Sequence, residues 1–97
     1  MFELTGFQRD LLWVIAALDR PSGQEVMAKF SEYVESINHG RLYPNLDALA
    51  DRGLVNKGQR NRRTNYYEIS DEGLELLEER RQWEKALVDL EVDEPSE

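Results

Sequence analysis

The chain has 97 residues, of which 12 are Lys or Arg and 20 are Asp or Glu, so its formal net charge is −8. A chain this short forms one domain with a small core, and a second subunit would add to that core. It contains no Cys, which excludes disulfides and thiolate metal sites, and a small domain without disulfides is typical of the cell interior. The longest apolar run, residues 11–18, is far shorter than the ~20 residues that span a bilayer. We therefore expect a cytoplasmic protein that does not enter membranes.

The charged residues are unevenly distributed along the chain. Residues 1–37 carry three basic and six acidic groups, residues 38–65 carry six and two, and residues 66–97 carry three and twelve. The middle third alone is basic, and the chain has nine Arg against three Lys. An acidic surface with few lysines is typical of proteins that stay hydrated in concentrated salt, so we expect a halophilic protein. An ordinary acidic protein of a low-salt cell is the alternative.

The first helix is predicted to begin after Thr5 and to end near Leu18. Thr5 and Gln8 have the spacing of a capping box, and Arg20-Pro21 stops the helix. Besides the stripe that faces the core, a second apolar face is present, which is more than a three-helix domain of this size needs. This second face holds Leu12, Trp13, Ala16 and Ala17.

The second helix is predicted to begin after Ser22, which has a capping-box partner in Glu25. Apolar residues then recur at helical spacing as far as Ile37, so we expect the helix to continue to that residue. These apolar residues are Val26, Phe30, Tyr33 and Ile37.

The third helix is predicted to begin after Asn38, a good N-cap, and to end at Gly53, a left-handed C-cap. Pro44 lies close to the first turn, where the missing N–H costs little, so we expect a tolerated kink. The side chains that point inward are Leu42, Leu46 and Leu49.

Two short strands follow the third helix. They cover residues 54–57 and 65–69 and are joined by residues 58–64, so they form a hairpin with a basic tip. Ser70 caps a last helix that runs over residues 71–88 or beyond.

The order of elements, three helices, a hairpin and a final helix, is that of a winged helix-turn-helix. We therefore predict a mainly α fold with a small β-hairpin. Residues 1–70 form the winged helix-turn-helix domain, residues 71–90 a C-terminal dimerisation helix, and residues 91–97 an acidic, disordered tail.

Two parts of the sequence resemble the PadR family of transcriptional regulators. Residues 38–49 (NHGRLYPNLDAL) contain the Leu-Tyr-Pro run of the family's recognition helix and are followed by Gly53-Leu54-Val55. Residues 62–67 (RRTNYY) are similar to the Arg-Tyr-Tyr residues of its wing. The resemblance covers residues 4–75, and the acidic composition is similar to that of PadR-like regulators of halophilic archaea. It implies a dimeric DNA-binding regulator, although this chain has one C-terminal helix where many members have a multi-helix dimerisation domain.

The exposed face of the third helix holds the first candidate DNA contacts. Asp47 and Asp51 would repel phosphates, so we expect only the N-terminal half of this helix to enter a major groove. Arg41 is the best candidate for base recognition, because its planar fork matches the O6 and N7 atoms of guanine. The alternative is that Arg41 and Asn45 are solvated helix residues, and we expect Tyr43 to pack at the domain edge. The predicted contacts of this helix are Asn38, His39, Gly40, Arg41 and Asn45.

The tip of the hairpin holds the second set of candidates. Arg60, Arg62 and Arg63 lie within four positions of a chain that has only three Lys. Arg binds phosphates and is preferred in narrow, electronegative minor grooves, so we expect the tip to contact the DNA backbone or minor groove. A solvated loop is the alternative. The predicted contacts are Arg60, Asn61, Arg62, Arg63, Thr64 and Asn65.

The last helix carries two sets of apolar residues. We expect Leu74 and Leu77 to continue the domain core. The second set, at heptad spacing, has nothing left to pack on within one subunit, so we expect it to pair with its symmetry mate and with the partner's first helix. Packing of Trp83 within its own domain is the alternative. The expected dimer interface consists of Leu12, Trp13, Ala16, Leu76, Trp83, Leu87 and Leu90.

We expect no enzymatic activity, no cofactor and no metal site. The chain has no phosphate-binding loop and no Cys nucleophile, and His39 is its only histidine, without partners at metal-ligand spacing. The predicted function is that of a homodimeric, sequence-specific transcriptional regulator that binds double-stranded DNA. A winged-helix module that binds another protein of the transcription apparatus is the alternative, and the basic wing distinguishes the two. The sequence does not indicate a small-molecule effector.

Overall fold

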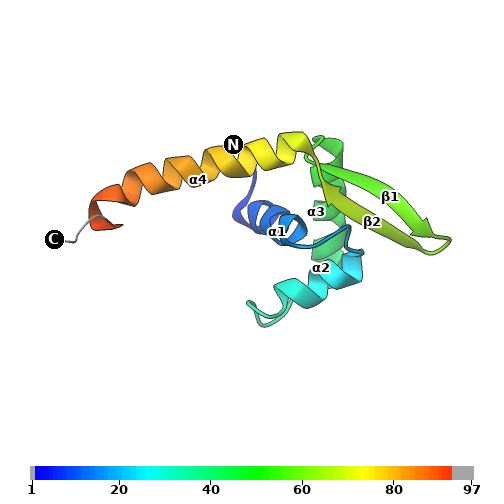
Figure 1. The fold of residues 1–97 in the computed structure, drawn as a ribbon. Helices are drawn as coiled ribbons and strands as arrows, with labels where there is room; N and C mark the ends of the chain where they lie inside the picture. Colours follow the sequence, from blue (N-terminus) through cyan, green and yellow to red (C-terminus); the bar gives the residue numbers. More distant parts are fainter. Residues whose placement is uncertain (1, 93–97) are drawn as a thin grey trace.

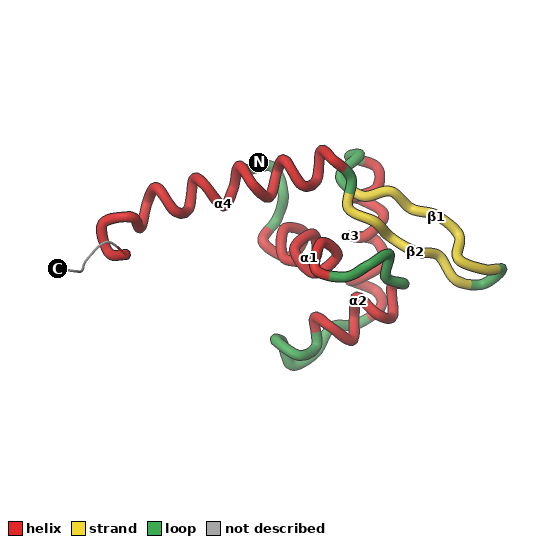
Figure 2. Tube along the Cα trace, in the orientation of Figure 1, coloured by secondary structure: helices red, strands yellow, loops and turns green. Residues whose placement is uncertain are grey.

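The computed structural model describes the backbone of residues 2–92 and the side chains of residues 2–88. Its elements follow the predicted order and confirm the mainly α fold with a small antiparallel hairpin (Figure 1, Figure 2). None of the described helices is long and apolar enough to cross a membrane. α4 includes residues 91–92 of the predicted tail, and residues 93–97 lie outside the described part. The elements are α1 (Gly6–Ala17), α2 (Gly23–Phe30), α3 (His39–Asp51), β1 (Val55–Asn61), β2 (Thr64–Ile69) and α4 (Asp71–Val92).

The first three helices begin where the sequence predicts, because a side chain caps each start. Thr5 Oγ1 accepts a hydrogen bond from the Gln8 N–H (3.1 Å), and Gln8 Oε1 accepts one from the Thr5 N–H (3.2 Å). Ser22 and Glu25 repeat this capping box at α2, and the Asn38 side chain caps α3. These bonds satisfy N–H groups that the start of a helix leaves without partners.

α2 ends at Phe30, well before the predicted end at Ile37. The backbone N–H groups of Glu32 and Tyr33 bond three residues back, which tightens the last turn and ends the α-helical pattern. Tyr33 is 71% exposed, whereas Ile37 packs against the core from the connection to α3. The prediction was wrong because apolar spacing shows only where side chains would point if the segment were helical. Ser31 and Ser36 instead favour a turn, because their hydroxyls compete with the backbone for hydrogen bonds, and Asn38 can then cap the next helix.

α3 continues through Pro44 and is followed by Gly53, which has the predicted left-handed conformation (φ 78°). Its inner face packs against α1, α2 and β1, and its three leucines are fully buried. The outer face stays exposed on a helix that the core holds in place. The buried residues of the core are Leu4, Leu11, Leu12, Val14, Ile15, Val26, Phe30, Leu42, Leu46, Leu49, Leu54, Val55, Tyr67 and Leu77.

β1 and β2 are longer than predicted, and Arg62 and Arg63 alone form the turn between them. Most of the predicted loop is paired, with Gly58 opposite Tyr66. The sequence pattern does not predict a strand over these polar residues. Gly58 has no side chain and so leaves room for the Tyr66 ring, and pairing between the strands extends the hairpin. We call this hairpin, residues 55–69, the wing.

The first turns of α4 pack on the domain, and the rest of the helix extends away from it (Figure 1). Gly73 approaches the Leu54 carbonyl so closely that a side chain would not fit, and Leu77 is buried. Leu74 is 50% exposed, so its predicted place in the core is wrong. The reason is that Gly73, not Leu74, faces the hairpin in this turn of the helix. Leu76, which was predicted to meet a partner subunit, is half-buried and packs at the edge of its own core.

Candidate nucleic-acid interface

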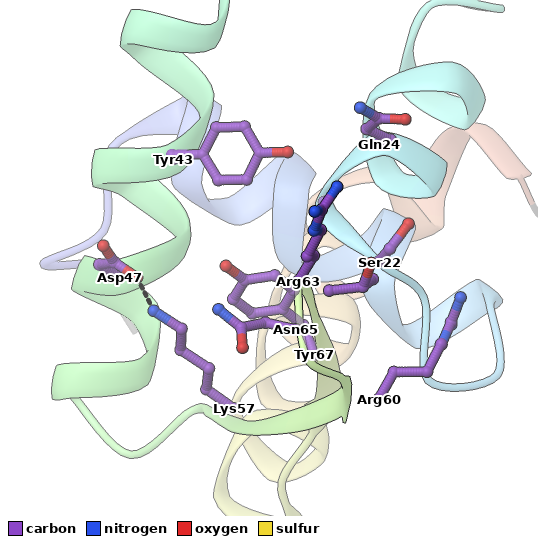
Figure 3. Close-up of a pocket in the computed structure, with 11 residues that line it drawn as sticks. Ser22, Gln24, Tyr43, Asp47, Lys57, Arg60, Arg63, Asn65 and Tyr67 are labelled. Carbon is purple, nitrogen blue, oxygen red and sulfur yellow. Dashed lines mark hydrogen bonds and ion pairs between the residues drawn. The ribbon is translucent and has the colours of Figure 1, made fainter.

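A groove with a volume of about 410 Å³ lies between α3, the wing and the first turn of α2 (Figure 3). Its walls come from three parts of the chain that are far apart in sequence. Three of its side chains are basic and one is acidic, so the lining is basic on balance, as a site for a polyanion requires. The lining residues are Ser22, Gly23, Gln24, Tyr43, Asp47, Lys57, Arg60, Arg63, Thr64, Asn65 and Tyr67.

Tyr43 forms the wall of the groove where α3 meets α2. A Cβ atom at Gly23 would lie 2.5 Å from the Tyr43 ring, so only glycine allows this close approach. The His39 ring stacks on the Tyr43 ring, with centroids 5.8 Å apart and planes inclined by 7°. Tyr43 is therefore held by packing, as expected, and its hydroxyl points into the groove (Figure 3).

Arg60 ties the wing to α2 rather than projecting from the tip. Its Nη2 donates to Glu25 Oε1 (3.0 Å) and to the Arg20 carbonyl oxygen (2.6 Å). The hydrogen bond from Arg60 lowers the pKa of the Glu25 carboxyl, and the same bond raises the pKa of Arg60. The structure thus separates Arg60 from the other two arginines with which it was grouped, because its carboxylate partner comes from another element.

Arg62 and Arg63 form the tip of the wing, and both are exposed. Among the described residues, neither guanidinium forms an ion pair or a side-chain hydrogen bond. Asn61 Oδ1 accepts a hydrogen bond from the Arg63 N–H (3.0 Å), so Asn61 shapes the turn. In Figure 3 the Arg63 side chain lies between Tyr43 and Gln24. Two arginines are therefore open to an anion from outside the chain.

Lys57 and Asp47 form an ion pair across the groove, with 2.9 Å between Nζ and Oδ1 (Figure 3). The bond to Asp47 raises the pKa of the Lys57 ammonium. Asp47 and Asp51 were both expected to repel DNA, and both are exposed. The charge of Asp47 is offset by Lys57, whereas Asp51 forms no ion pair within the described residues. Sequence reasoning missed Lys57, although the alternation of a strand places it on the same face as buried Val55.

None of the predicted contacts in the first half of α3 lines the groove. The Arg41 guanidinium lies over the Phe7 ring of α1, 3.9 Å from its centroid. Asn45 donates from Nδ2 to the Arg41 carbonyl oxygen (2.7 Å) and accepts at Oδ1 from Gln8 Nε2 (2.9 Å). Asn38 accepts the capping bond described above. The two asparagines are thus bonded within the subunit. All members of the set except the half-buried Asn45 are exposed.

Three residues of the predicted dimer interface contact the core of their own subunit. Leu12 is fully buried, and Ala16 and Leu76 pack against the same core. The reason is that α1 contacts α2, α3, α4 and β2, so it needs its second apolar face within one subunit. For Leu12 the predicted contact with a partner is corrected to a core role, whereas Ala16 and Leu76 are half-buried, and their contact with a partner stays a prediction.

The other predicted interface residues have exposed apolar surface. Trp13 is 39% exposed on α1, and Trp83 and Leu87 are 38% and 63% exposed on α4. Phe2 meets the Trp83 ring edge-on, with centroids 5.1 Å apart, so Trp83 is partly covered within its own chain. The side chain of Leu90 lies outside the described part. Large apolar side chains therefore remain uncovered along the projecting half of α4.

Comparison with known proteins identifies the family. Residues 11–79 match the model of the transcriptional regulator PadR-like family. The chain belongs to this family. RosR of H. salinarum is 36% identical to this PadR-like protein, with a TM-score of 0.82 over 88% of this chain and 77% of that chain. A PadR-like transcriptional regulator from Bacillus cereus is 25% identical, with a TM-score of 0.71 over 90% of this chain and 87% of its own.

F93 from STIV, a winged-helix DNA-binding protein, is similar to this PadR-like protein in fold alone, at 18% identity and a TM-score of 0.68 over 84% of this chain and 89% of F93. No curated protein matches the chain significantly. The comparisons confirm the family resemblance and the winged-helix fold, and they place the protein among DNA-binding transcriptional regulators rather than enzymes. RosR comes from a halophilic archaeon, in agreement with the acidic composition. Within the described residues, no group of three or more side chains could hold a metal ion.

Proposed function

We propose that this PadR-like regulator binds double-stranded DNA sequence-specifically as a homodimer. The observation that carries the proposal is the tip of the wing, where Arg62 and Arg63 have no carboxylate partner among the described residues of a chain with a net charge of −8. The nearby cations Lys57 and Arg60 are each paired with a carboxylate. A guanidinium binds phosphate through two parallel hydrogen bonds, so the tip suits the DNA backbone or a narrow minor groove.

The N-terminal half of α3 is the part that we propose for the major groove. Its first turn is exposed, and Gly40 allows a close approach to DNA. Arg41 is exposed on the same half of the helix, and its donors fit the O6 and N7 atoms of guanine. On the wing side, Thr64 and Asn65 line the groove next to α3. This arrangement supports base recognition by α3 and backbone binding by the wing.

The second half of α4 is the part that we propose for dimerisation. Trp83, Leu87 and Val88 are exposed on it, and Trp13 is exposed on α1. A second copy of this chain would cover such a surface with the same residues, as heptad spacing favours. A two-fold dimer places its two α3 helices on half-sites about one helical turn of DNA apart. Since a regulator of this kind works beside the DNA, we also propose a cytoplasmic location.

The wing is tested by fluorescence anisotropy with labelled duplexes of random sequence across a KCl series. Arg62→Ala combined with Arg63→Ala removes two cations per subunit. We expect weaker binding to every duplex, and a slope of log affinity against log salt that is shallower by about two per subunit, because fewer counterions are released.

Lys29→Ala is the control, because this lysine lies on the last turn of α2 and pairs with Glu32 (3.4 Å). It removes one cation at the end of α2 opposite the groove, so the slope should stay as in the wild type. A wild-type protein that binds no duplex, or a double variant with the wild-type slope, would contradict the proposal.

A further inference from the structure

Arg41 rests on an aromatic side chain from a different helix. Its guanidinium carbon lies 3.9 Å from the centroid of the Phe7 ring, at the start of α1. Phe7 also stacks on Phe30, with ring centroids 5.6 Å apart and planes inclined by 19°. Phe30 is buried in the core. The core therefore fixes the Phe7 ring, which offers Arg41 a rigid platform.

Stacking on this platform leaves the hydrogen-bonding capacity of Arg41 free. Within the described residues the Arg41 side chain donates no hydrogen bond, so the five N–H donors of its guanidinium stay free while it rests on the ring. In the described part of the chain no carboxylate pairs with Arg41, and its side chain is exposed. The donors that match guanine therefore remain accessible.

A second contact couples the same two helices. Asn45, one turn after Arg41, bonds to the Arg41 carbonyl oxygen through Nδ2 and to Gln8 Nε2 through Oδ1. Gln8 is also the capping-box residue of α1 and accepts from the Thr5 N–H. Asn45 thus links the first turns of α3 to the start of α1.

We infer that Phe7 is a positioning residue for base recognition, so that α1 contributes to sequence specificity without touching DNA. The inference rests on the proposed reading of guanine by Arg41. A free Arg side chain loses rotamer freedom when it binds a base, and the platform removes part of this loss before binding. The effect is confined to the base pair that Arg41 reads, whereas the wing arginines act on every sequence.

The test selects duplexes from a random library with the wild-type chain and with variants. Arg41→Ala identifies the base pair that Arg41 reads, because preference is lost there alone. Phe7→Leu and Phe7→Met keep an apolar side chain but remove the ring. We expect the preference at that base pair to fall about two- to fivefold per half-site, the value of an exposed cation–π contact, while affinity for unrelated duplexes is unchanged. Phe7→Tyr keeps the ring and should keep the preference.

Val14→Ala is the matched control, because Val14 is buried on the same helix two turns after Phe7, so the change disturbs the core and leaves the Phe7 ring and its contact with Phe30 in place. This control should keep the wild-type preference at the base pair that Arg41 reads. Thermal unfolding of each variant identifies a temperature at which all of them are folded, and the selections are done at that temperature. If Arg41→Ala removes the preference at one base pair and the Phe7 variants do not, or if Val14→Ala lowers that preference equally, the positioning role is wrong while recognition by Arg41 stands. If Arg41→Ala leaves the preference at every base pair unchanged, Arg41 does not recognise a base, and the inference about Phe7 is wrong as well.

Discussion

At the scale of single residues, the pair of Asp47 and Lys57 shows how a partner changes what a charge does at an interface. By its charge alone Asp47 repels DNA, but its bond to Lys57 offsets both charges. We predict that Asp47→Asn releases Lys57 to bind a phosphate, because an amide attracts an ammonium less strongly than a carboxylate does. Affinity for all duplexes should rise at low salt, and the slope of log affinity against log salt should steepen by about one per subunit.

Asp51→Asn is the matched control for this prediction. It removes the same charge one turn further along α3, where none of the described lysines or arginines forms an ion pair with the carboxylate. Asp51 attracts Lys57 without bonding to it and raises the pKa of Lys57 less than Asp47 does. Affinity should then rise mainly through weaker repulsion, and the slope should change less than with Asp47→Asn. Equal slopes for the two variants in one KCl series would show that Lys57 does not reach the DNA.

Residue type and spacing predict the candidate residues here, but not their partners. The run from Arg60 to Arg63 stands out in an acidic chain, yet Arg60 pairs with Glu25, 35 positions away. Arg41 stands out on α3, but the ring beneath it comes from Phe7. Such pairs form only when separate elements pack together, and no local pattern of the sequence contains that information.

At the scale of elements, α4 has two halves in different surroundings. We predict that Leu87→Glu, in the half that projects from the domain, gives a monomer at micromolar concentration with a folded winged-helix domain. The reason is that a carboxylate loses hydration in an apolar interface without gaining a partner. Leu87 is already exposed within one subunit, so the domain itself should stay folded.

Light scattering measures the oligomeric state of this variant, and circular dichroism checks its fold. Leu74→Glu is the matched control, because Leu74 is also exposed on α4 but lies off the heptad positions, and this variant should remain a dimer. A wild-type monomer, or a Leu87→Glu protein that is still dimeric, would refute dimerisation through the second half of α4.

The starts of the first three helices and the ends of α1 and α3 could be predicted from the sequence, whereas the end of α2 and the length of the wing could not. Capping by Thr5, Ser22 and Asn38 depends on residues three positions apart, so it is visible locally. The end of α2 depends on where the next helix starts, and the length of the wing depends on pairing with the opposite strand. The core role of Leu12 depends on how many elements surround α1, which only the packed structure shows.

At the scale of the whole molecule, negative charge and the groove are kept apart. α4 is rich in Glu and extends away from the wing, whose tip carries Arg62 and Arg63 (Figure 1). Salt of about 0.1 M screens exposed charges beyond roughly 10 Å, so acidic residues on the projecting helix repel DNA at the groove only weakly. An acidic protein can therefore bind DNA through a small basic surface.

Hydroxyl-radical footprinting on a duplex selected from a random library tests the central claim, a homodimer that holds DNA with α3 and the wing, most directly. We predict two protected backbone segments on one face of the duplex, related by two-fold symmetry and about one helical turn apart. In the protein that carries both Arg62→Ala and Arg63→Ala, protection should shrink at both segments equally, because each subunit contributes one wing. A single protected segment, or two segments without the two-fold relation, would contradict the claim.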